Sequence, residues 1–315
     1  MPSKTNTCMY LCLPSINWAI VDLLQLRYFQ AVARHQHVSR AAGELRIAQP
    51  ALSRSIARLE AELGVPLFDR RGRRVVLNRF GAAFLHRVGT ALGELDQARR
   101  ELHDAAGLAR GSVAIATETL RTITDLIARF LAEHPEVSFQ LYQSPAPEMV
   151  AQLQAGQVDL CFTSQPLRGP ALRSAKLLSE EVLLAVPRTH RLARRRRVKV
   201  ETLAGEPFIT TCTGYWQRTL TDQLFATSGI HPAIVCESNE PYAIRGLISA
   251  GVGVGLMPEI ARQATSHPPV AWLHLDTTGC RRTFSVVWRQ DTYLSIAAQR
   301  FRDFAASHDL SWSPE

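Results

Sequence analysis

The chain has 315 residues, enough for two domains with separate hydrophobic cores, and 46% hydrophobic against 20% charged residues excludes a largely disordered protein. The formal net charge is +8, and most of it lies in the first third. Residues 1–110 carry 16 basic and 9 acidic side chains, whereas residues 111–315 carry 20 and 19. This asymmetry favours one region that contacts a polyanion and another that does not.

Several other classes of protein are excluded by simple patterns. The sequence has no run of 18 apolar residues, so we expect no transmembrane helix and no membrane partner. The first 20 residues lack the pattern of a secretory signal. The six cysteines have no paired spacing, the histidines are scattered, and no phosphate-binding or hydrolase motif occurs. We therefore expect a cytoplasmic protein that is not an enzyme and holds no metal or cofactor.

Three helices are predicted between residues 24 and 63, and the last two form a helix-turn-helix. Ser39 is expected to cap the second helix, which ends at Leu45. The third helix, Gln49–Leu63, has apolar residues at helical spacing on one face and ends before Gly64. The polar residues that lie off this apolar face are Gln49, Pro50, Ser53, Arg54 and Arg58.

A β-hairpin is predicted after the third helix, because short apolar runs flank the tip Arg71-Gly72-Arg73-Arg74. Residues 21–80 hold 11 arginines against 5 acidic residues. Arginine can form paired hydrogen bonds with phosphate or guanine and can enter a narrow minor groove. These arginines could instead form an ordinary solvated face. A polar helix face beside a basic hairpin favours a winged helix-turn-helix that binds DNA.

The segment LQLRYFQAVARHQHVSRAAGELRIAQPALSRSIARLEAELGVPLFDRRGRRVVLNRFG resembles the winged helix-turn-helix of LysR-type transcriptional regulators. The motifs AQPALSRSI, LEAELGVPLFDR and RGRRVVLN carry this resemblance. It implies that the polar face of the third helix enters the major groove of operator DNA and that the wing approaches the minor groove. The candidate DNA-binding residues are Ser39, Gln49, Pro50, Ser53, Arg54, Arg58, Arg71, Arg73 and Arg74.

The same resemblance suggests where the DNA-binding domain begins. The sequence also differs from the usual family pattern at two positions. Domain starts in the family lead us to assign residues 21–80 to this domain and residues 1–20 to a tail or a mis-assigned start. Ala48 stands where a serine usually caps the third helix, and Gln36 stands where a glycine is usual. Neither change removes a candidate DNA contact.

A long linker helix is predicted for residues 81–108, with Asn78 as its cap. Its apolar positions recur at alternating steps of 4 and 3, which is typical of a seam between two helices. The alternative is a helix packed on its own domain. The resemblance implies a homodimer through this helix and, in many members, a tetramer. The seam residues are Phe84, Val88, Ala91, Leu95, Ala98 and Leu102.

Strands and helices alternate from Ser112 onwards, which predicts parallel sheets covered by helices in two lobes. The phrases FLAEHPEVSFQL, LQAGQVDLCFTS and LISAGVGVGLMP resemble the effector-binding domain of the same family, which has the fold of periplasmic solute-binding proteins. The predicted fold class is therefore α/β, with a winged helix-turn-helix, a linker helix and a two-lobed domain over residues 111–305. Lobe I is expected to comprise residues 111–163 and 241–305, and lobe II residues 164–240.

A ligand is expected between the lobes, at the carboxyl ends of the strands. Small hydroxyls beside helix N-termini suit a carboxylate, whereas Glu118 and Glu240 near the same rim disfavour a highly charged anion. The hydroxyls could instead cap helices, and Cys212 could serve as a thiol sensor. The candidate effector-binding residues are Thr117, Thr119, Thr163, Ser164, Thr211, Cys212, Thr213, Ser238 and Asn239.

The sequence thus predicts a bacterial transcriptional regulator that binds double-stranded operator DNA and responds to a small-molecule effector, such as a carboxylate. One alternative is a cytosolic solute-binding protein or an enzyme that uses the two-lobe fold. The arginine-rich winged segment disfavours it. A chromatin-architectural protein without a ligand is a further alternative, which the predicted cleft disfavours.

Overall fold

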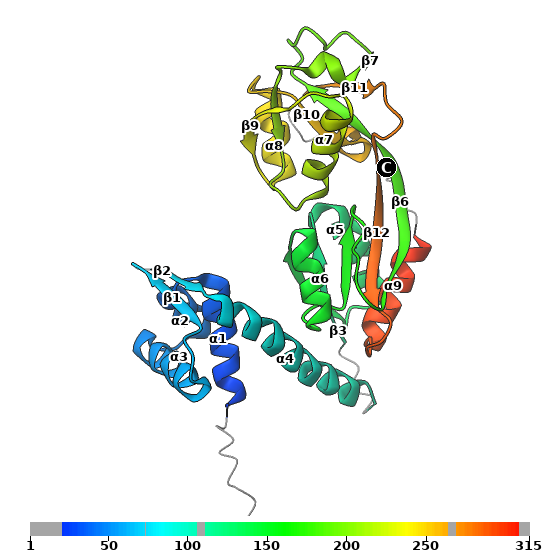
Figure 1. Ribbon diagram of the computed structural model, residues 1–315. Coiled ribbons are helices and arrows are strands. Elements are labelled where there is room, and N and C mark those ends of the chain that lie inside the picture. Colours follow the sequence, from blue (N-terminus) through cyan, green and yellow to red (C-terminus); the bar gives the residue numbers. More distant parts are fainter. Residues whose placement is uncertain (1–20, 73, 106–110, 264–268, 309–315) are drawn as a thin grey trace, which may run out of the picture. The chain divides into compact units, whose positions relative to one another are not determined.

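The computed structural model describes residues 21–72, 74–105, 111–263 and 269–308. The expectations for residues 1–20 and for Arg73 therefore concern residues outside these ranges. The chain forms two compact units, the first ending at Gly89 and the second beginning at Thr90 (Figure 1).

The first unit is a helical core with a two-stranded wing. Phe29 is fully buried, and its ring lies 5.4 Å from that of Phe68 and 5.3 Å from that of Phe84. The two wing strands are antiparallel. The elements are α1 (Leu23–His35), α2 (Val38–Leu45), α3 (Gln49–Leu63), β1 (Phe68–Arg71), β2 (Arg74–Leu77) and the beginning of α4 (Arg79–Ala105). The predicted winged helix-turn-helix is confirmed.

The helix ends follow local sequence signals, with one correction. Gly64 has a φ of 71° and ends α3, as expected. The predicted capping role of Ser39 is wrong, because α2 begins one residue earlier and His37 occupies the capping position without a side-chain bond. Ala48 likewise gives α3 no side-chain cap, and its carbonyl accepts from the N–H groups of Ala51 and Leu52 instead.

The long helix α4 begins where Asn78 accepts hydrogen bonds from the N–H groups of Phe80 and Gly81, both at 2.9 Å. The predicted seam has a part that is covered within the chain and a part that is exposed. Val88 is buried within the chain and Phe84 is half-buried, so the beginning of the stripe already has partners. The exposed part of the seam consists of Ala91, Leu95, Ala98 and Leu102.

The second unit is built on one mixed sheet and a smaller parallel pair of strands. Its elements after α4 are β3 (Ser112–Thr117), α5 (Arg121–Glu133), β4 (Ser138–Gln143), α6 (Ala146–Gln154), β5 (Leu160–Thr163), β6 (Leu172–Val186), β7 (Arg197–Val198), β8 (Pro207–Thr210), α7 (Trp216–Thr227), β9 (Ala233–Glu237), α8 (Pro241–Ser249), β10 (Gly255–Pro258), β11 (Ala271–Leu275), β12 (Arg281–Arg289) and α9 (Ile296–Ser307), with short 3-10 helices at Val200–Leu203 and Glu259–Gln263.

Strands β6 and β12 connect the two lobes. They pair antiparallel, from Arg281 opposite Glu181 to Arg289 opposite Leu172, and the end of β6 then pairs with β10 and β11 (Figure 1). The larger sheet has the order β4-β3-β5-β12-β6-β11-β7, and β8 pairs with β9. The expectation of purely parallel sheets is therefore wrong, because these long strands return the chain across both lobes.

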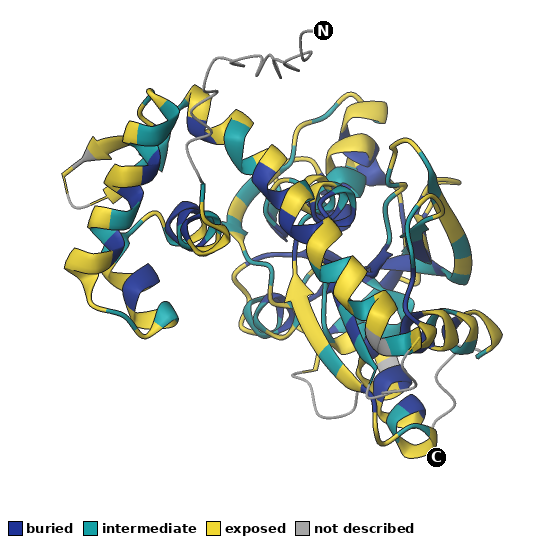
Figure 2. Ribbon diagram, turned by 90° about the horizontal axis from the view of Figure 1, so that it is seen from below, coloured by how far each residue is buried: buried dark blue, intermediate teal, exposed yellow. Residues whose placement is uncertain are grey.

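The packing also corrects the division into lobes. The first core gathers side chains from β3, α5, β5, β12 and α9, whereas Ile244, Leu256 and Leu273 pack in the second lobe with residues such as Phe208. Residues 241–263 and 269–275 therefore belong to lobe II and not, as expected, to lobe I. Lobe I contains β3–β5, β12 and α9. The buried residues lie between sheets and helices in each lobe (Figure 2).

The end of α4 packs against lobe I within the second unit. Gly93 leaves no room for a side chain, because a Cβ atom there would lie 1.6 Å from the carbonyl oxygen of Ala155. Two turns further along, the guanidinium of Arg100 lies 3.6 Å from the carboxylate of Asp159. The carboxylate of Asp104 accepts from the hydroxyl of Tyr293 at 2.7 Å. The side of α4 opposite the exposed stripe is thus occupied by its own chain.

Candidate functional site

The first candidate site is the outward face of α3. Leu52, Ile56 and Leu59 are buried, so the helix has one orientation in its domain. On the other side Gln49, Pro50 and Arg54 are exposed, and the amide of Gln49 donates to Ser53 Oγ at 2.9 Å. These side chains form a continuous polar face of donors and acceptors, as base recognition requires.

Two further candidates flank this face, and both remain accessible. Arg58 is exposed, although its Nε donates to Glu62 one turn away at 2.9 Å. Arg74 is exposed at the start of β2, directly opposite Arg71 at the tip of the wing. Ser39 is exposed on α2. Apart from Arg73, the candidate DNA-binding residues thus lie on the helix-turn-helix and the wing, as expected.

The second candidate site is a cavity of about 160 Å³ where helices α5, α7 and α8 begin. Three of the nine candidate effector-binding residues line it, namely Thr119, Thr211 and Asn239. The full lining consists of Glu118, Thr119, Arg121, Thr122, Asp125, Leu126, Arg129, Thr211, Tyr215, Trp216, Gln217, Asn239, Pro241, Ile244, Met257, Pro258, Ile260, Ala261, Arg282 and His308. The wall is thus mostly apolar, with a few charged groups, as is usual for small-molecule sites.

The other candidates lie behind this lining or outside it. Thr117 is buried and its hydroxyl donates to the carbonyl of Thr119 at 3.1 Å. Ser238 Oγ accepts from the N–H of Glu240 at 3.2 Å, so it serves a turn, and Thr213 is exposed. Cys212 is a free, half-buried thiol whose backbone N–H donates to the Asn239 side chain at 3.1 Å.

Glu118 is a buried carboxylate held by three donors from one segment. Oε1 accepts from the Thr163 hydroxyl at 3.2 Å and from the Gln165 amide at 3.1 Å, and Oε2 accepts from the Ser164 N–H at 2.8 Å. Thr163 and Ser164 therefore shape the cavity wall through Glu118. Burial raises the pKa of the Glu118 carboxyl, and these bonds and the charge of Arg282 oppose that rise.

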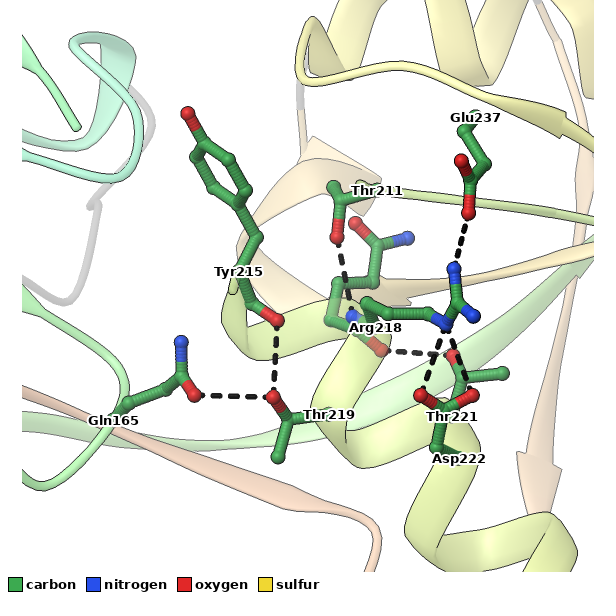
Figure 3. Close-up of polar contacts among 9 residues, drawn as sticks. Gln165, Thr211, Tyr215, Arg218, Thr219, Thr221, Asp222 and Glu237 are labelled. Atoms are coloured by element: carbon green, nitrogen blue, oxygen red, sulfur yellow. Dashed lines mark hydrogen bonds and ion pairs between the residues drawn. The ribbon is translucent and has the colours of Figure 1, made fainter. Parts of the chain in front are cut away.

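The lobes are bridged beside the cavity by Gln165. Its amide group donates to the carbonyl of Gly214 at 3.0 Å. Its carbonyl oxygen accepts from the hydroxyl of Thr219 on α7 at 3.1 Å, as Figure 3 shows. The amide of Gln143 likewise donates to the carbonyl of Asn239 at 3.2 Å. These contacts join lobe I to lobe II, so a change in lobe orientation must alter them.

Arg282 is a site residue that the sequence analysis missed. It lies on β12 directly opposite Glu180 on β6, and its Nε donates to Glu180 Oε1 at 2.6 Å. Its guanidinium lies 5.2 Å from the centroid of the Trp216 ring. The alternation of Arg282, Phe284 and Val286 on a buried strand face could have revealed it, but this strand was not predicted.

The pH dependence of stability tests the environment of Glu118. Its pKa is higher in the folded than in the unfolded chain, so the folded state takes up the proton first as the pH falls. Relative to Glu118→Gln, the native chain should therefore gain stability as the pH falls through the raised pKa of Glu118 towards the ordinary carboxyl pKa of 4.5. Urea titrations across this range measure the difference in free energy of unfolding.

Asp291→Asn is a control for which we expect the opposite change of stability with pH. A hydrogen bond from Arg289 lowers the pKa of the exposed Asp291 carboxyl, so its contribution to stability is lost as the pH falls through that lowered pKa. A difference between the native chain and Glu118→Gln that stays constant with pH would contradict the assignment of a raised pKa to Glu118.

Comparison with known proteins identifies the family. Residues 23–82 match the profile described as "Bacterial regulatory helix-turn-helix protein, lysR family", and residues 106–309 match "LysR substrate binding domain". The chain is 37% identical to the "Uncharacterized HTH-type transcriptional regulator YybE" of Bacillus subtilis, over 90% of this chain and 98% of that protein. It is 31% identical to the "Transcriptional dual regulator GltC" of the same organism, over 90% and 96%.

The solved structures agree with this result. The full-length regulator CbnR in complex with its target DNA is 25% identical, with a TM-score of 0.64 over 90% of this chain and 98% of that chain. The chain therefore belongs to the LysR family of bacterial transcriptional regulators, with a helix-turn-helix DNA-binding domain and an effector-binding domain. Regulators of this family bind operator DNA and small-molecule effectors and act as oligomers.

No helix in the described ranges is both long and apolar enough to cross a membrane. Among the same residues, no group of three or more histidine, cysteine, aspartate or glutamate side chains is arranged to hold a metal ion.

Proposed function

We propose that this regulator recognises its operator through the outward face of α3 and the β1–β2 wing. The observation that carries the proposal is the polar row of Gln49, Ser53 and Arg54, in which Gln49 and Arg54 are exposed and Ser53 is half-buried, on a helix whose other face is buried. An amide, a hydroxyl and a guanidinium on one face can contact several adjacent base edges. Arg74 extends the basic surface to the wing, where it can approach a phosphate or the minor groove.

Two chains are proposed to pair through α4. The exposed stripe of Ala91, Leu95, Ala98 and Leu102 continues at heptad spacing, and Leu102 is 70% exposed. Pairing would bury this apolar surface and place two DNA-binding domains on two half-sites. Two such dimers are proposed to form a tetramer through their effector-binding domains. We also propose a cytoplasmic location, because a bacterial operator lies in that compartment.

The cavity between the lobes is proposed to bind the effector, which changes operator binding by shifting an equilibrium between orientations of the lobes. Gln165 and Gln143 support this proposal, because their hydrogen bonds join the two lobes beside the cavity. The proposed role of the second unit is binding, without turnover of the effector.

Footprinting on the DNA that flanks the gene tests the function, with random DNA at the same salt concentration as reference. We expect two protected half-sites and an affinity well above that for random DNA. Leu102→Glu should dissociate the dimer in sedimentation and weaken the two-site footprint, whereas Leu141→Glu, also at an exposed leucine but on β4, should leave α4 pairing intact. Equal affinity for operator and random DNA would contradict the proposal.

A further inference from the structure

The lining of the cavity includes a buried cation, Arg282, with one donor that has no partner. The side chain of Arg282 is 3% exposed, and its Nη2 has no hydrogen-bond partner among the described residues. Its Nε is bonded to Glu180, whose other oxygen accepts from the N–H of Ile260 at 2.6 Å. An unsatisfied donor on a buried charged group is unfavourable, so this wall of the cavity favours a ligand that supplies an acceptor oxygen.

The charges around Arg282 favour one carboxylate on that ligand. A charge-assisted bond from a guanidinium to a carboxylate is stronger than one to a neutral carbonyl, and Arg121 and Arg129 add positive charge to the lining. Helices α5, α7 and α8 begin at the cavity, and helix N-termini favour negative charge. The lining also contains the acidic residues Glu118 and Asp125, which favour one carboxylate over two on the ligand.

The size and the remaining wall favour a single ring. The volume of about 160 Å³ is close to that of a protein cavity of about 150 Å³ that binds benzene. Leu126, Ile244 and Met257 supply apolar surface, and the ring of Trp216 lies beside the guanidinium. A small ring carrying one carboxylate would thus satisfy both the apolar wall and the free donor.

We propose that the effector is a single-ring monocarboxylic acid and that the guanidinium of Arg282 binds its carboxylate. The inference rests on the proposed function, because it assigns the ligand class of the same cavity. Arg282 is then the residue that distinguishes an acid from its neutral analogues.

Calorimetry on the full-length protein tests the ligand class without any substitution. The probes are benzoate, 4-hydroxybenzoate, cyclohexanecarboxylate and furan-2-carboxylate, each compared with its amide, and phthalate as the dicarboxylate. We expect at least one acid to bind with one-to-one stoichiometry and at least about tenfold more tightly than its amide, with phthalate weaker than benzoate. Binding of none of the acids, or equal binding of acid and amide, would overturn the proposal.

Substitution of Arg282 tests the residue. Arg282→Lys keeps the charge opposite Glu180 but removes the planar fork, and we expect it to weaken binding of the acid by at least about tenfold while the amide is little affected. Arg289→Lys is the matched control, because Arg289 lies on the same strand outside the cavity and is bonded to Asp291 and the Gln154 carbonyl. Equal losses of acid affinity in the two variants would show that Arg282 does not bind the carboxylate.

Footprinting with the same probes separates this inference from the proposed function. If an acid binds and Arg282→Lys abolishes binding, but operator affinity never responds to it, the ligand class stands and the regulatory role of the cavity fails. If operator affinity responds to an amide or a cation and to no acid, the regulatory role stands and the assignment of a monocarboxylic acid is wrong.

Discussion

Gly93→Ala is expected to detach the end of α4 from lobe I. The new Cβ would lie 1.6 Å from the Ala155 carbonyl oxygen and 2.6 Å from its carbon, and these are backbone atoms that a rotamer change does not move. The next residue, Gly156, has a φ of 63°, so the loop that carries this carbonyl is itself conformationally restricted. We expect a loss of about 3 kcal/mol, the upper end of the range for overpacked sites.

The measurement is amide hydrogen exchange in α4 together with the free energy of unfolding of the full chain. Gly246→Ala on α8 is the matched control, because nothing lies within 4 Å of a Cβ atom at that position. Since alanine is favoured over glycine inside a helix, the control should gain about 0.5–1 kcal/mol. If both variants gained stability, α4 would not pack against Ala155.

Arg54→Ala is expected to reduce sequence discrimination. Arg54 is exposed on the polar face of α3, and a paired arginine–guanine contact contributes about 1–3 kcal/mol of discrimination. Operator affinity should therefore fall about 5- to 150-fold, while affinity for random DNA at the same salt concentration falls much less. Fluorescence anisotropy with both DNAs measures the ratio.

Two further variants separate base recognition from phosphate contact. Arg74→Ala on the wing should weaken binding to operator and to random DNA about equally. The slope of log affinity against log salt concentration should become smaller by about one, because about one fewer counterion is released. Arg188→Ala removes an exposed arginine from the second unit and should change neither affinity. Equal losses for operator and random DNA in Arg54→Ala would assign Arg54 to the phosphate backbone instead of a base.

The predictions from sequence were most accurate where structure is determined by neighbouring residues. Helix α3 was predicted as Gln49–Leu63 and has these bounds, because an apolar stripe defines its face and Gly64 ends it. The predicted cap at Ser39 was the exception in this unit, because α2 begins at Val38, one residue before Ser39. The polar face of α3 that we propose to bind DNA follows directly from the same local pattern.

The cavity depended on contacts between distant residues, and there the sequence was less informative. Arg282 acquires its role only through pairing with Glu180, 102 residues earlier in the chain. Strand β6 runs for 15 residues and is mostly exposed or half-buried at first and buried at its end, so it shows no single period. Thr163 and Ser164 were predicted near the ligand but hold Glu118 instead, which only the fold could reveal.

Strand β5 gives the cavity and the linker helix a common rigid segment. It has four residues, all buried, and ends at Thr163, which donates to Glu118. Immediately before it, Asp159 accepts from the N–H of Ala114 at 2.8 Å and lies beside Arg100 of α4. If this strand couples the two sites, the coupling must be reciprocal: the factor by which the ligand changes operator affinity equals the factor by which operator changes ligand affinity. Titrating the ligand into the operator complex and into free protein should give affinities that differ by this one factor.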